Sequence, residues 1–287
     1  MHYAKPTTAA EAAKLLAAET GVTRVLAGGT DVLVQLKAGM IEPALVIDIK
    51  AIPGIRAITA EAGGFRIGAA VSGAELGEHA ALCAAWPGVT EAAQLIGSKQ
   101  VQGRCSMVGN LCNGSPAADA VPGLVAAGAT VRIEGPSGSR DVAVETIPTG
   151  PGKTSLVKGE IITSVHLPAR AARSSDAYLR FIPRTEMDIA VASAGVSLTL
   201  DAAGTVTAAR VAIGAVAPTV LLVEACAKAI IGTRLDDAAL AALEKAASAA
   251  AKPIDDKRGT IDFRVKVVGV LARRAAVIAY TRAGGQK

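Results

Sequence analysis

Aromatic residues are scarce in this chain, which has one Trp, three Tyr and three Phe among 287 residues. So few rings cannot build a platform on which nucleic-acid bases stack, and a net charge of +5 is only a mild attraction for phosphate. No apolar run approaches the roughly 18 residues that a bilayer span needs. We therefore expect neither a nucleic-acid partner nor a membrane span.

Cysteine is also sparse, and the four residues Cys83, Cys105, Cys112 and Cys226 show no C-x-x-C spacing. This argues against a disulfide framework, a zinc site and the ligation of an iron–sulfur cluster within the chain. We expect reduced thiols and no bound metal. Residues 1–6 lead into no apolar segment, so no secretory signal is readable and a cytoplasmic location is expected.

Length and aliphatic side chains are what the chain does have. Its 287 residues, 51% of them hydrophobic, are enough for about two domains with packed cores. Strand-like and helix-like segments are mixed along the sequence, which predicts an α+β fold. We place an N-terminal domain at residues 1–172, with subdomains of about 1–55 and 56–172. A C-terminal unit of a sheet and flanking helices is predicted over residues 173–287.

Most segments have a clear periodicity, and one does not. Strands are predicted over residues 24–27, 45–49, 160–167, 179–182, 189–200 and 206–216, and hairpins over 55–70 and 130–144. Helices are predicted over residues 76–85, 89–96, 119–129, 220–231, 236–251 and 260–280. Residues 98–118 are irregular and rich in Gly, Ser and Asn. Such a stretch leaves backbone groups that a ligand can satisfy, so we expect a binding site there.

Two glycine-containing loops combine small residues with hydroxyl or amide side chains, at residues 27–31 and 106–110. Glycine lets a ligand approach the backbone closely, and exposed N–H groups at the start of a helix near Asp31 suit a phosphate. Neither loop reads G-x-G-x-x-G or contains a Walker lysine, so a Rossmann fold or a nucleotide triphosphatase is not supported. Taken singly, each loop is also explained as a tight connection.

Several segments, taken in order, resemble the FAD-binding medium subunit of molybdenum hydroxylases, the family of xanthine dehydrogenase and carbon monoxide dehydrogenase. The similarity is strongest where the sequence reads Leu-Ala-Gly-Gly-Thr-Asp-Val-Leu at residues 26–33, and along residues 98–119. Order and spacing agree over nearly the whole chain. The similar segments also include residues 3–6, 43–48, 159–168, 184–190 and 256–274.

The resemblance implies a fold of the vanillyl-alcohol-oxidase (PCMH) type, in which two N-terminal subdomains hold FAD. A C-terminal domain of the carbon monoxide dehydrogenase flavoprotein type follows. It implies an oxidoreductase subunit that passes electrons from [2Fe–2S] clusters of a small partner subunit through FAD to an external acceptor. A large partner subunit would carry molybdopterin, and the complex would be a dimer of heterotrimers. The substrate and the acceptor stay open.

The resemblance also implies which residues contact FAD. Backbone N–H groups of residues 27–31 would hold the diphosphate on one side, and Ser106, Gly109 and Asn110 on the other. Asp119 would bond the ribose or a neighbouring polar group. No catalytic side chain is implied, because the chemistry belongs to the cofactor. The implied FAD contacts are Arg24, Val25, Leu26, Ala27, Gly28, Gly29, Thr30, Asp31, Ile96, Gly97, Val101, Cys105, Ser106, Gly109, Asn110, Cys112, Asn113, Asp119, Ile162 and Arg180.

One loop departs from the family pattern, which usually reads Thr-Ile-Gly-Gly-Asn. Val108 stands at the first glycine, and Cys105 precedes Ser106. If that position requires a positive φ, a β-branched Val would be strained there. Cys112 is interpreted as a small buried hydrophobe rather than a redox thiol. Arg180 is either a strand-surface residue or a cation that stabilises reduced flavin.

Two further classes of function compete with the electron-transfer subunit. A stand-alone flavin oxidase or dehydrogenase would need its own substrate pocket, for which the C-terminal part is small and poor in Tyr. A flavin-free assembly subunit would have kept the fold while Val108 disabled cofactor binding. Turnover by the isolated chain would identify the first, and an FAD titration would identify the second.

Overall fold

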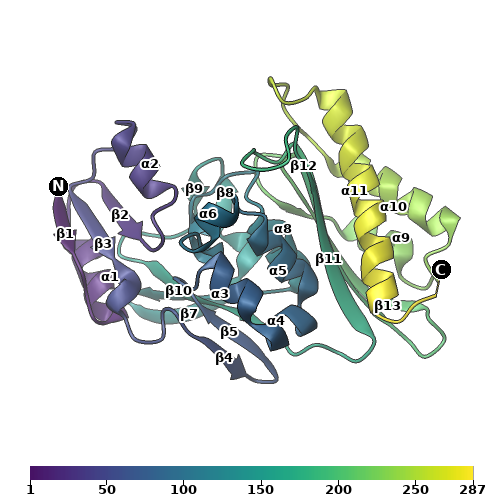
Figure 1. Cartoon of the computed structure of the whole chain (residues 1–287), viewed down its shortest axis with the longest axis horizontal. Helices are drawn as coiled ribbons and strands as arrows, with labels where there is room; N and C mark the ends of the chain where they lie inside the picture. Colours follow the sequence, from purple (N-terminus) through teal and green to yellow (C-terminus); the bar gives the residue numbers. More distant parts are fainter. Residues whose placement is uncertain (287) are drawn as a thin grey trace.

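The computed structural model describes residues 1–286. The chain starts with a small parallel sheet in the order β1-β3-β2, at the left of Figure 1. All four residues of its central strand are buried, as expected for a parallel sheet covered on both faces. The elements of this first subdomain are β1 (His2–Ala4), α1 (Ala9–Ala18), β2 (Thr23–Leu26), α2 (Val32–Lys37), β3 (Leu45–Asp48) and a 3₁₀ turn (Ile49–Ala51).

The second subdomain is built on a five-stranded antiparallel sheet in the order β4-β5-β10-β6-β7. Its strands are β4 (Ile58–Glu61), β5 (Gly64–Gly68), β6 (Thr130–Gly135), β7 (Gly138–Ala143) and β10 (Ile161–Leu167). Its helices are α3 (Gly73–Glu78), α4 (Ala80–Ala85), α5 (Pro87–Gln94), α6 (Lys99–Gln102), α7 (Met107–Cys112) and α8 (Ala120–Ala127). A 3₁₀ turn (Val144–Thr146) leads into a small hairpin of β8 (Pro148–Gly150) and β9 (Lys153–Thr154).

Two predictions for this subdomain are wrong in detail. The single helix expected over residues 76–85 is two helices, because the His79 side chain caps α4 by accepting a hydrogen bond from Leu82 N at 3.1 Å. The stretch 98–118, expected to be irregular, contains α6 and α7. These helices have four and six residues, too short for an apolar periodicity to be visible in the sequence.

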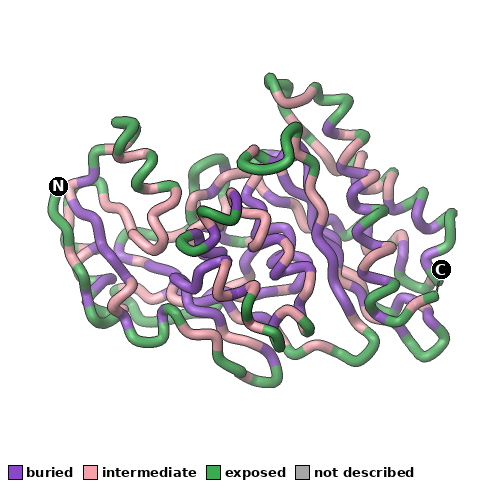
Figure 2. Tube along the Cα trace, in the orientation of Figure 1, coloured by how far each residue is buried: buried purple, intermediate pink, exposed green. Residues whose placement is uncertain are grey.

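The C-terminal domain is a four-stranded antiparallel sheet in the order β11-β12-β13-β14, with α11 packed against β11 and β12 (Figure 1). Buried residues run through the central strands of this sheet and through the larger N-terminal sheet (Figure 2). The elements are β11 (Ser174–Phe181), β12 (Ala192–Leu200), β13 (Val206–Gly214), β14 (Leu221–Leu222), α9 (Glu224–Ile230), α10 (Asp237–Ala250) and α11 (Ile261–Arg282). The helix predicted to begin at residue 220 begins only at Glu224, so that predicted start is wrong. Residues 221–222 instead pair with β13.

The two domains meet where α8 packs against β12 and β13. This contact is close because Gly195 in β12 has no side chain: a Cβ there would lie 2.5 Å from the carbonyl oxygen of Pro122. The boundary expected after residue 172 falls between β10 and β11. Among residues 1–286, no helix is long and apolar enough to cross a bilayer.

Candidate functional site

Two loops from different subdomains touch at the C-terminal end of β2. Gly28, which follows β2, lies so close to Arg104 that a Cβ on Gly28 would stand 1.6 Å from the Arg104 carbonyl oxygen. The next residue, Gly29, has a φ of 82°, a conformation that side chains rarely adopt. Only glycine at these two positions allows the loop of residues 27–31 to meet the loop of residues 104–110.

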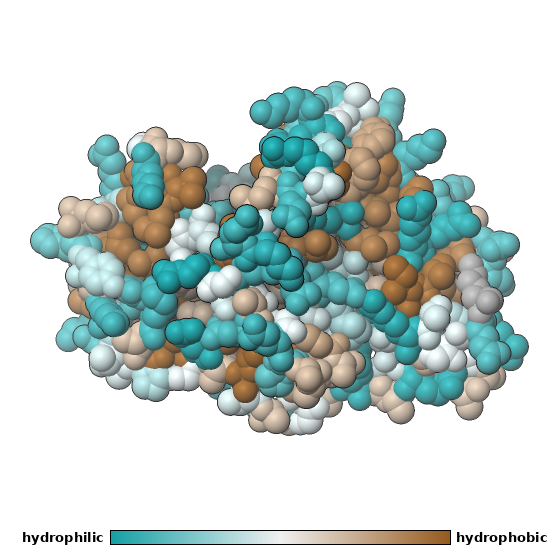
Figure 3. All heavy atoms as spheres, in the orientation of Figure 1, coloured by the Kyte–Doolittle hydropathy of each residue, from teal (hydrophilic) through white to brown (hydrophobic). Residues whose placement is uncertain are grey.

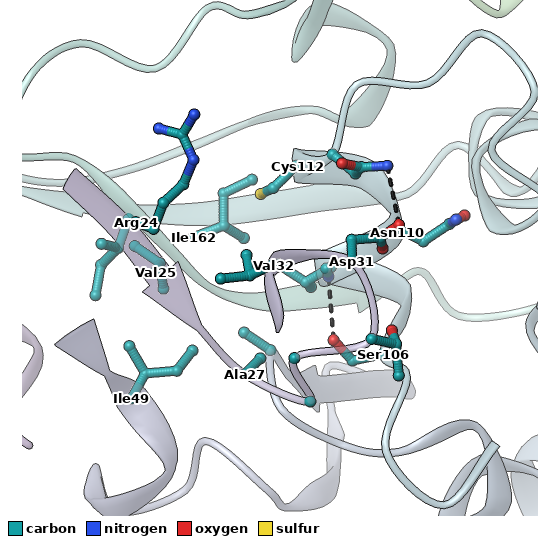
Figure 4. Close-up of a pocket in the computed structure, with 18 of the residues that line it drawn as sticks. Arg24, Val25, Ala27, Asp31, Val32, Ile49, Ser106, Asn110, Cys112 and Ile162 are labelled. Atoms are coloured by element: carbon teal, nitrogen blue, oxygen red, sulfur yellow. Dashed lines mark hydrogen bonds between the residues drawn. The ribbon is translucent and has the colours of Figure 1, made fainter. Parts of the chain in front are cut away.

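A cleft of about 420 Å³ runs along this junction, within the range usual for small-molecule sites. One side is formed by β2 and residues 27–35, and another by residues 105–113. Residues 152–162, from the β8–β9 hairpin to the start of β10, line the remainder. Figure 4 shows Arg24, Val25 and Ile162 around one part of the cleft, with Ser106 and Asn110 at another. The ends of parallel strands β2 and β3 thus contribute to a crevice, as in other α/β proteins.

Residues 27–31 of the first loop line this cleft and supply backbone N–H groups. Within residues 1–286, the N–H groups of residues 28–31 donate no hydrogen bond to the protein. On the other side, the Ser106 hydroxyl caps α7 by accepting from Gly109 N at 3.1 Å (Figure 4). Free backbone N–H groups in a glycine turn form a cradle for an anion. The donor set therefore fits the diphosphate of a dinucleotide.

A carboxylate lies beside these donors. Asp31 lines the cleft, and its Oδ1 accepts a hydrogen bond from Asn113 Nδ2 at 3.3 Å. Burial raises the pKa of the Asp31 carboxyl. Asn113 in turn accepts from Gln35 Nε2 at 3.3 Å. This chain of amides joins α2 to the end of α7 across the cleft.

Helix α2, which forms one flank of the cleft, has no buried residue although its sequence is largely apolar. Leu33 and Val34 are exposed, and so is Met40 just beyond the helix. Figure 3 shows hydrophobic atoms over α2, and a dip in the molecular outline between α2 and the C-terminal domain. The packing of α2 on the rest of the chain is therefore slight.

Most of the residues expected to contact FAD line this one cleft. Those from the first loop and β2 that do so are Arg24, Val25, Ala27, Gly28, Gly29, Thr30 and Asp31. Those from the second loop and beyond are Ile96, Cys105, Ser106, Gly109, Asn110, Cys112, Asn113 and Ile162. Two segments about 75 residues apart in sequence therefore share one crevice.

Five expected residues do not line the cleft: Leu26, Gly97, Val101, Asp119 and Arg180. Leu26 is on β2 beside Gly29, and Gly97, with a φ of 66°, packs against the Val101 side chain. Sequence reasoning missed several lining residues, for which no motif was visible. They are Thr23, Val32, Gln35, Ile49, Ala69, Gly152, Thr154, Leu156, Glu160 and Ile161.

Asp119 and Arg180 form a buried ion pair that joins the two domains. Arg180 Nη1 donates to Asp119 Oδ2 at 2.8 Å, and the Tyr178 hydroxyl donates to Asp119 Oδ1 at 3.1 Å. Burial raises the pKa of Asp119, although the Arg180 charge opposes that effect. The pair borders the second loop, because Asn110 Oδ1 accepts a hydrogen bond from Ala120 N at 3.0 Å.

The residue that departs from the family pattern, Val108, carries no backbone strain. It lies in α7, and positive φ values of the described non-glycine residues occur elsewhere. The Val108 side chain is buried and forms part of the cleft wall. Cys112, expected to be buried, is instead exposed at the end of α7 and also lines the cleft.

The cleft lies within residues that match a known domain. Residues 1–170 match the model of the FAD binding domain in molybdopterin dehydrogenase, and residues 177–278 match the carbon monoxide dehydrogenase flavoprotein C-terminal domain. The chain belongs to this family of FAD-binding subunits. The resemblance seen in the sequence is therefore confirmed, and with it the cofactor FAD.

Similarity to individual members covers nearly the full length. The chain is 30% identical to the xanthine dehydrogenase FAD-binding subunit of Escherichia coli O157:H7, over 99% of this chain and 97% of that protein. It is 32% identical to the carbon monoxide dehydrogenase medium chain of Afipia carboxidovorans, over 98% and 97%. These relatives are subunits of oxidoreductases, and this chain is a flavoprotein subunit of the same class.

Solved structures agree with the family assignment. A chain of carbon monoxide dehydrogenase from Hydrogenophaga pseudoflava superimposes with a TM-score of 0.94 at 32% identity, with 98% of each chain covered. Reconstituted carbon monoxide dehydrogenase from Oligotropha carboxidovorans gives a TM-score of 0.93 at 31% identity, again over 98% of each chain. The expected fold, an FAD-binding domain followed by a flavoprotein C-terminal domain, is confirmed.

Proposed function

We propose that this chain is the electron-transfer subunit of a heterotrimeric molybdenum hydroxylase, taking electrons from [2Fe–2S] clusters of a partner and passing them to an external acceptor. The observation that carries the proposal is the meeting of two glycine loops at one cleft. Residues 28–31 line that cleft, and their N–H groups donate no hydrogen bond within residues 1–286. The stand-alone oxidase and the flavin-free assembly subunit have no comparable support.

The protein residues bind and orient in this proposal. Backbone N–H groups of residues 28–31 hold the diphosphate, and the apolar side chains of Val25, Ile96 and Ile162 exclude water from the rest of the cofactor. FAD supplies the ability to exchange one or two electrons when it is bound. The fifteen expected contact residues that line the cleft are its proposed binding set.

The partners follow from the family. We assign molybdopterin to a large subunit and the [2Fe–2S] clusters to a small subunit, since the spacing of the four Cys residues here suits no cluster. A dimer of heterotrimers in the cytoplasm is the proposed assembly. The names of the relatives, which concern xanthine and carbon monoxide, support the class of complex and leave the substrate open.

Purification of the affinity-tagged chain from its own cells tests the proposal. We expect one FAD per chain, together with molybdenum and iron in a constant ratio to flavin. Addition of an oxidised dye to the reduced complex should reoxidise the iron centres only when FAD is present. Turnover of an organic substrate by the isolated chain, or a flavin-loaded chain that purifies without molybdenum and iron, would contradict it.

A further inference from the structure

Lys50 stands beside the first loop but outside the cleft. Its Nζ donates a hydrogen bond to the carbonyl oxygen of Ala27 at 2.9 Å, while Ile49, its neighbour, lines the cleft. Lys50 itself is not among the residues that line the cleft. Lys50 therefore contacts the cleft wall through its hydrogen bond to the Ala27–Gly28 peptide.

The position of Lys50 is fixed by Asp48 at the end of β3. Lys50 Nζ lies 2.7 Å from Asp48 Oδ1, and the same oxygen accepts the backbone N–H of Lys50 at 3.0 Å. The other carboxylate oxygen accepts the Tyr3 hydroxyl at 2.6 Å. Burial opposes the charge on Asp48, but the hydrogen bonds from Lys50 and Tyr3 outweigh it and lower the pKa of this carboxyl.

The three strands of the first sheet bring these groups together (Figure 1). Asp48 pairs with Leu26, so the ends of β3 and β2 lie side by side, and Ala27 comes next in the chain. Tyr3 reaches Asp48 from β1, on the other side of β3. One line of hydrogen bonds thus crosses the sheet from Tyr3 through Asp48 and Lys50 to Ala27.

A trans peptide is planar, and its C=O and N–H groups point in opposite directions. No peptide bond in the described chain is cis. Because the Ala27 carbonyl is held toward Lys50, which does not line the cleft, the N–H of Gly28 points away from Lys50. That N–H is one of the donors that have no hydrogen-bond partner among residues 1–286.

We propose that Lys50 is a positioning residue for FAD, which orients the Ala27–Gly28 peptide so that Gly28 N–H donates to the cofactor diphosphate. Tyr3 and Asp48 hold Lys50 in place. This inference rests on the proposed use of the cleft for FAD. It assigns part of the affinity for the diphosphate to side chains at one end of the sheet that do not line the cleft.

Titration of the flavin-free full-length chain with FAD and with ADP tests the inference. ADP carries the diphosphate without the flavin. Lys50→Met should weaken both ligands by the same factor, about tenfold, since one charge-assisted hydrogen bond no longer orients the donor. Lys50→Arg should restore affinity to within about threefold of the wild type, because the guanidinium can still donate to Ala27 O.

Lys14→Met is the matched control, because it removes the same charge from an exposed position on α1 of the same subdomain. It should leave both affinities unchanged. Tyr3→Phe, which keeps the ring and the sheet, should weaken both ligands about twofold and supports the inference even where Lys50→Met fails to fold. Thermal melting of each variant identifies such a failure.

Three results would overturn the inference while leaving FAD binding intact. Lys50→Met and Tyr3→Phe could bind both ligands like the wild type. The loss could fall on FAD alone, which would place the effect away from the diphosphate. Lys50→Arg could be as weak as Lys50→Met. A wild-type chain that binds neither ligand would instead overturn the proposed function together with this inference.

Discussion

At the scale of single residues, the buried charges of Asp119 and Arg180 matter for the stability of the fold. Their side chains are only 10% and 6% exposed, and each depends on the other for its charged partner. The removal of one member of a buried pair leaves an uncompensated charge, which usually costs about 3–5 kcal/mol. The two residues therefore belong to the joint between domains, whatever further role they have toward FAD.

Arg180→Met is expected to lower the free energy of unfolding by about 3–5 kcal/mol at pH 8. Without Arg180, the pKa of Asp119 rises further above its unfolded value, so the carboxyl is protonated at a higher pH. The loss should therefore be smaller at pH 5 than at pH 8. Urea denaturation at both pH values measures it. Lys228→Met, which breaks an exposed pair with Glu224 at 3.6 Å, should change nothing measurable.

Cys112 offers a chemical probe of the cleft, because it is exposed there while Cys105 and Cys226 are buried. Desolvation raises the pKa of the Cys112 thiol to about 12, so a maleimide reagent should label it slowly in the flavin-free chain at pH 9. FAD should slow that labelling a further tenfold or more by covering the thiol. Cys83, half-buried outside the cleft, provides the internal control and should react at an unchanged rate. Equal rates at Cys112 with and without FAD, by mass spectrometry, would place the cofactor elsewhere.

At the scale of elements, the contact between the two loops depends on a missing Cβ. Gly28→Ala should abolish FAD binding, since the new methyl group would overlap the Arg104 carbonyl oxygen and push the loops apart. Gly103→Ala is the matched control: it lies one residue from Arg104, has a φ of −67° and has open space around its Cβ. It should bind FAD normally. Flavin fluorescence titration distinguishes the two, and equal affinities would refute the role of the contact.

The sequence predicts the strands and long helices well because their apolar residues are patterned over many positions, as in the nearly continuous buried run of β12 and the amphipathic helix α10. It also predicts most of the cleft, because the resemblance includes both loops. The β8–β9 hairpin was missed, since strands of two and three residues leave no pattern and their place beside Gly114 is set by a contact distant in sequence. Exposure of Cys112 was likewise not readable, because α7 is too short to define a buried face.

At the scale of the whole molecule, a second buried cluster joins the domains at the start of α5. The Asp176 carboxylate of β11 accepts a hydrogen bond from Val89 N at 3.0 Å and forms an ion pair with Arg170 at 2.8 Å. The Arg170 guanidinium lies 3.8 Å from the centre of the Trp86 ring. Burial raises the pKa of Asp176 to about 6, although Arg170 opposes the shift.

This raised pKa predicts how the stability of the joined domains depends on pH. The folded state retains the Asp176 proton up to a higher pH than the unfolded chain, whose carboxyl has a pKa of 3.8. The contribution to stability is therefore full below pH 4 and is lost as the pH rises toward 6 and beyond, by up to about 3 kcal/mol. Asp176→Asn should lack this decline. Urea denaturation between pH 4 and 7 measures the difference, and parallel pH profiles for the two proteins would contradict it.

Every residue that lines the cleft precedes β11, the first strand of the C-terminal domain. During synthesis on the ribosome, the walls of the flavin site are therefore complete before that domain emerges from the exit tunnel. N-terminal domains generally fold first as a chain is translated. FAD can thus bind to the N-terminal domain first, and the ion pair between Asp119 and Arg180 can form afterwards, when the C-terminal domain has been synthesised.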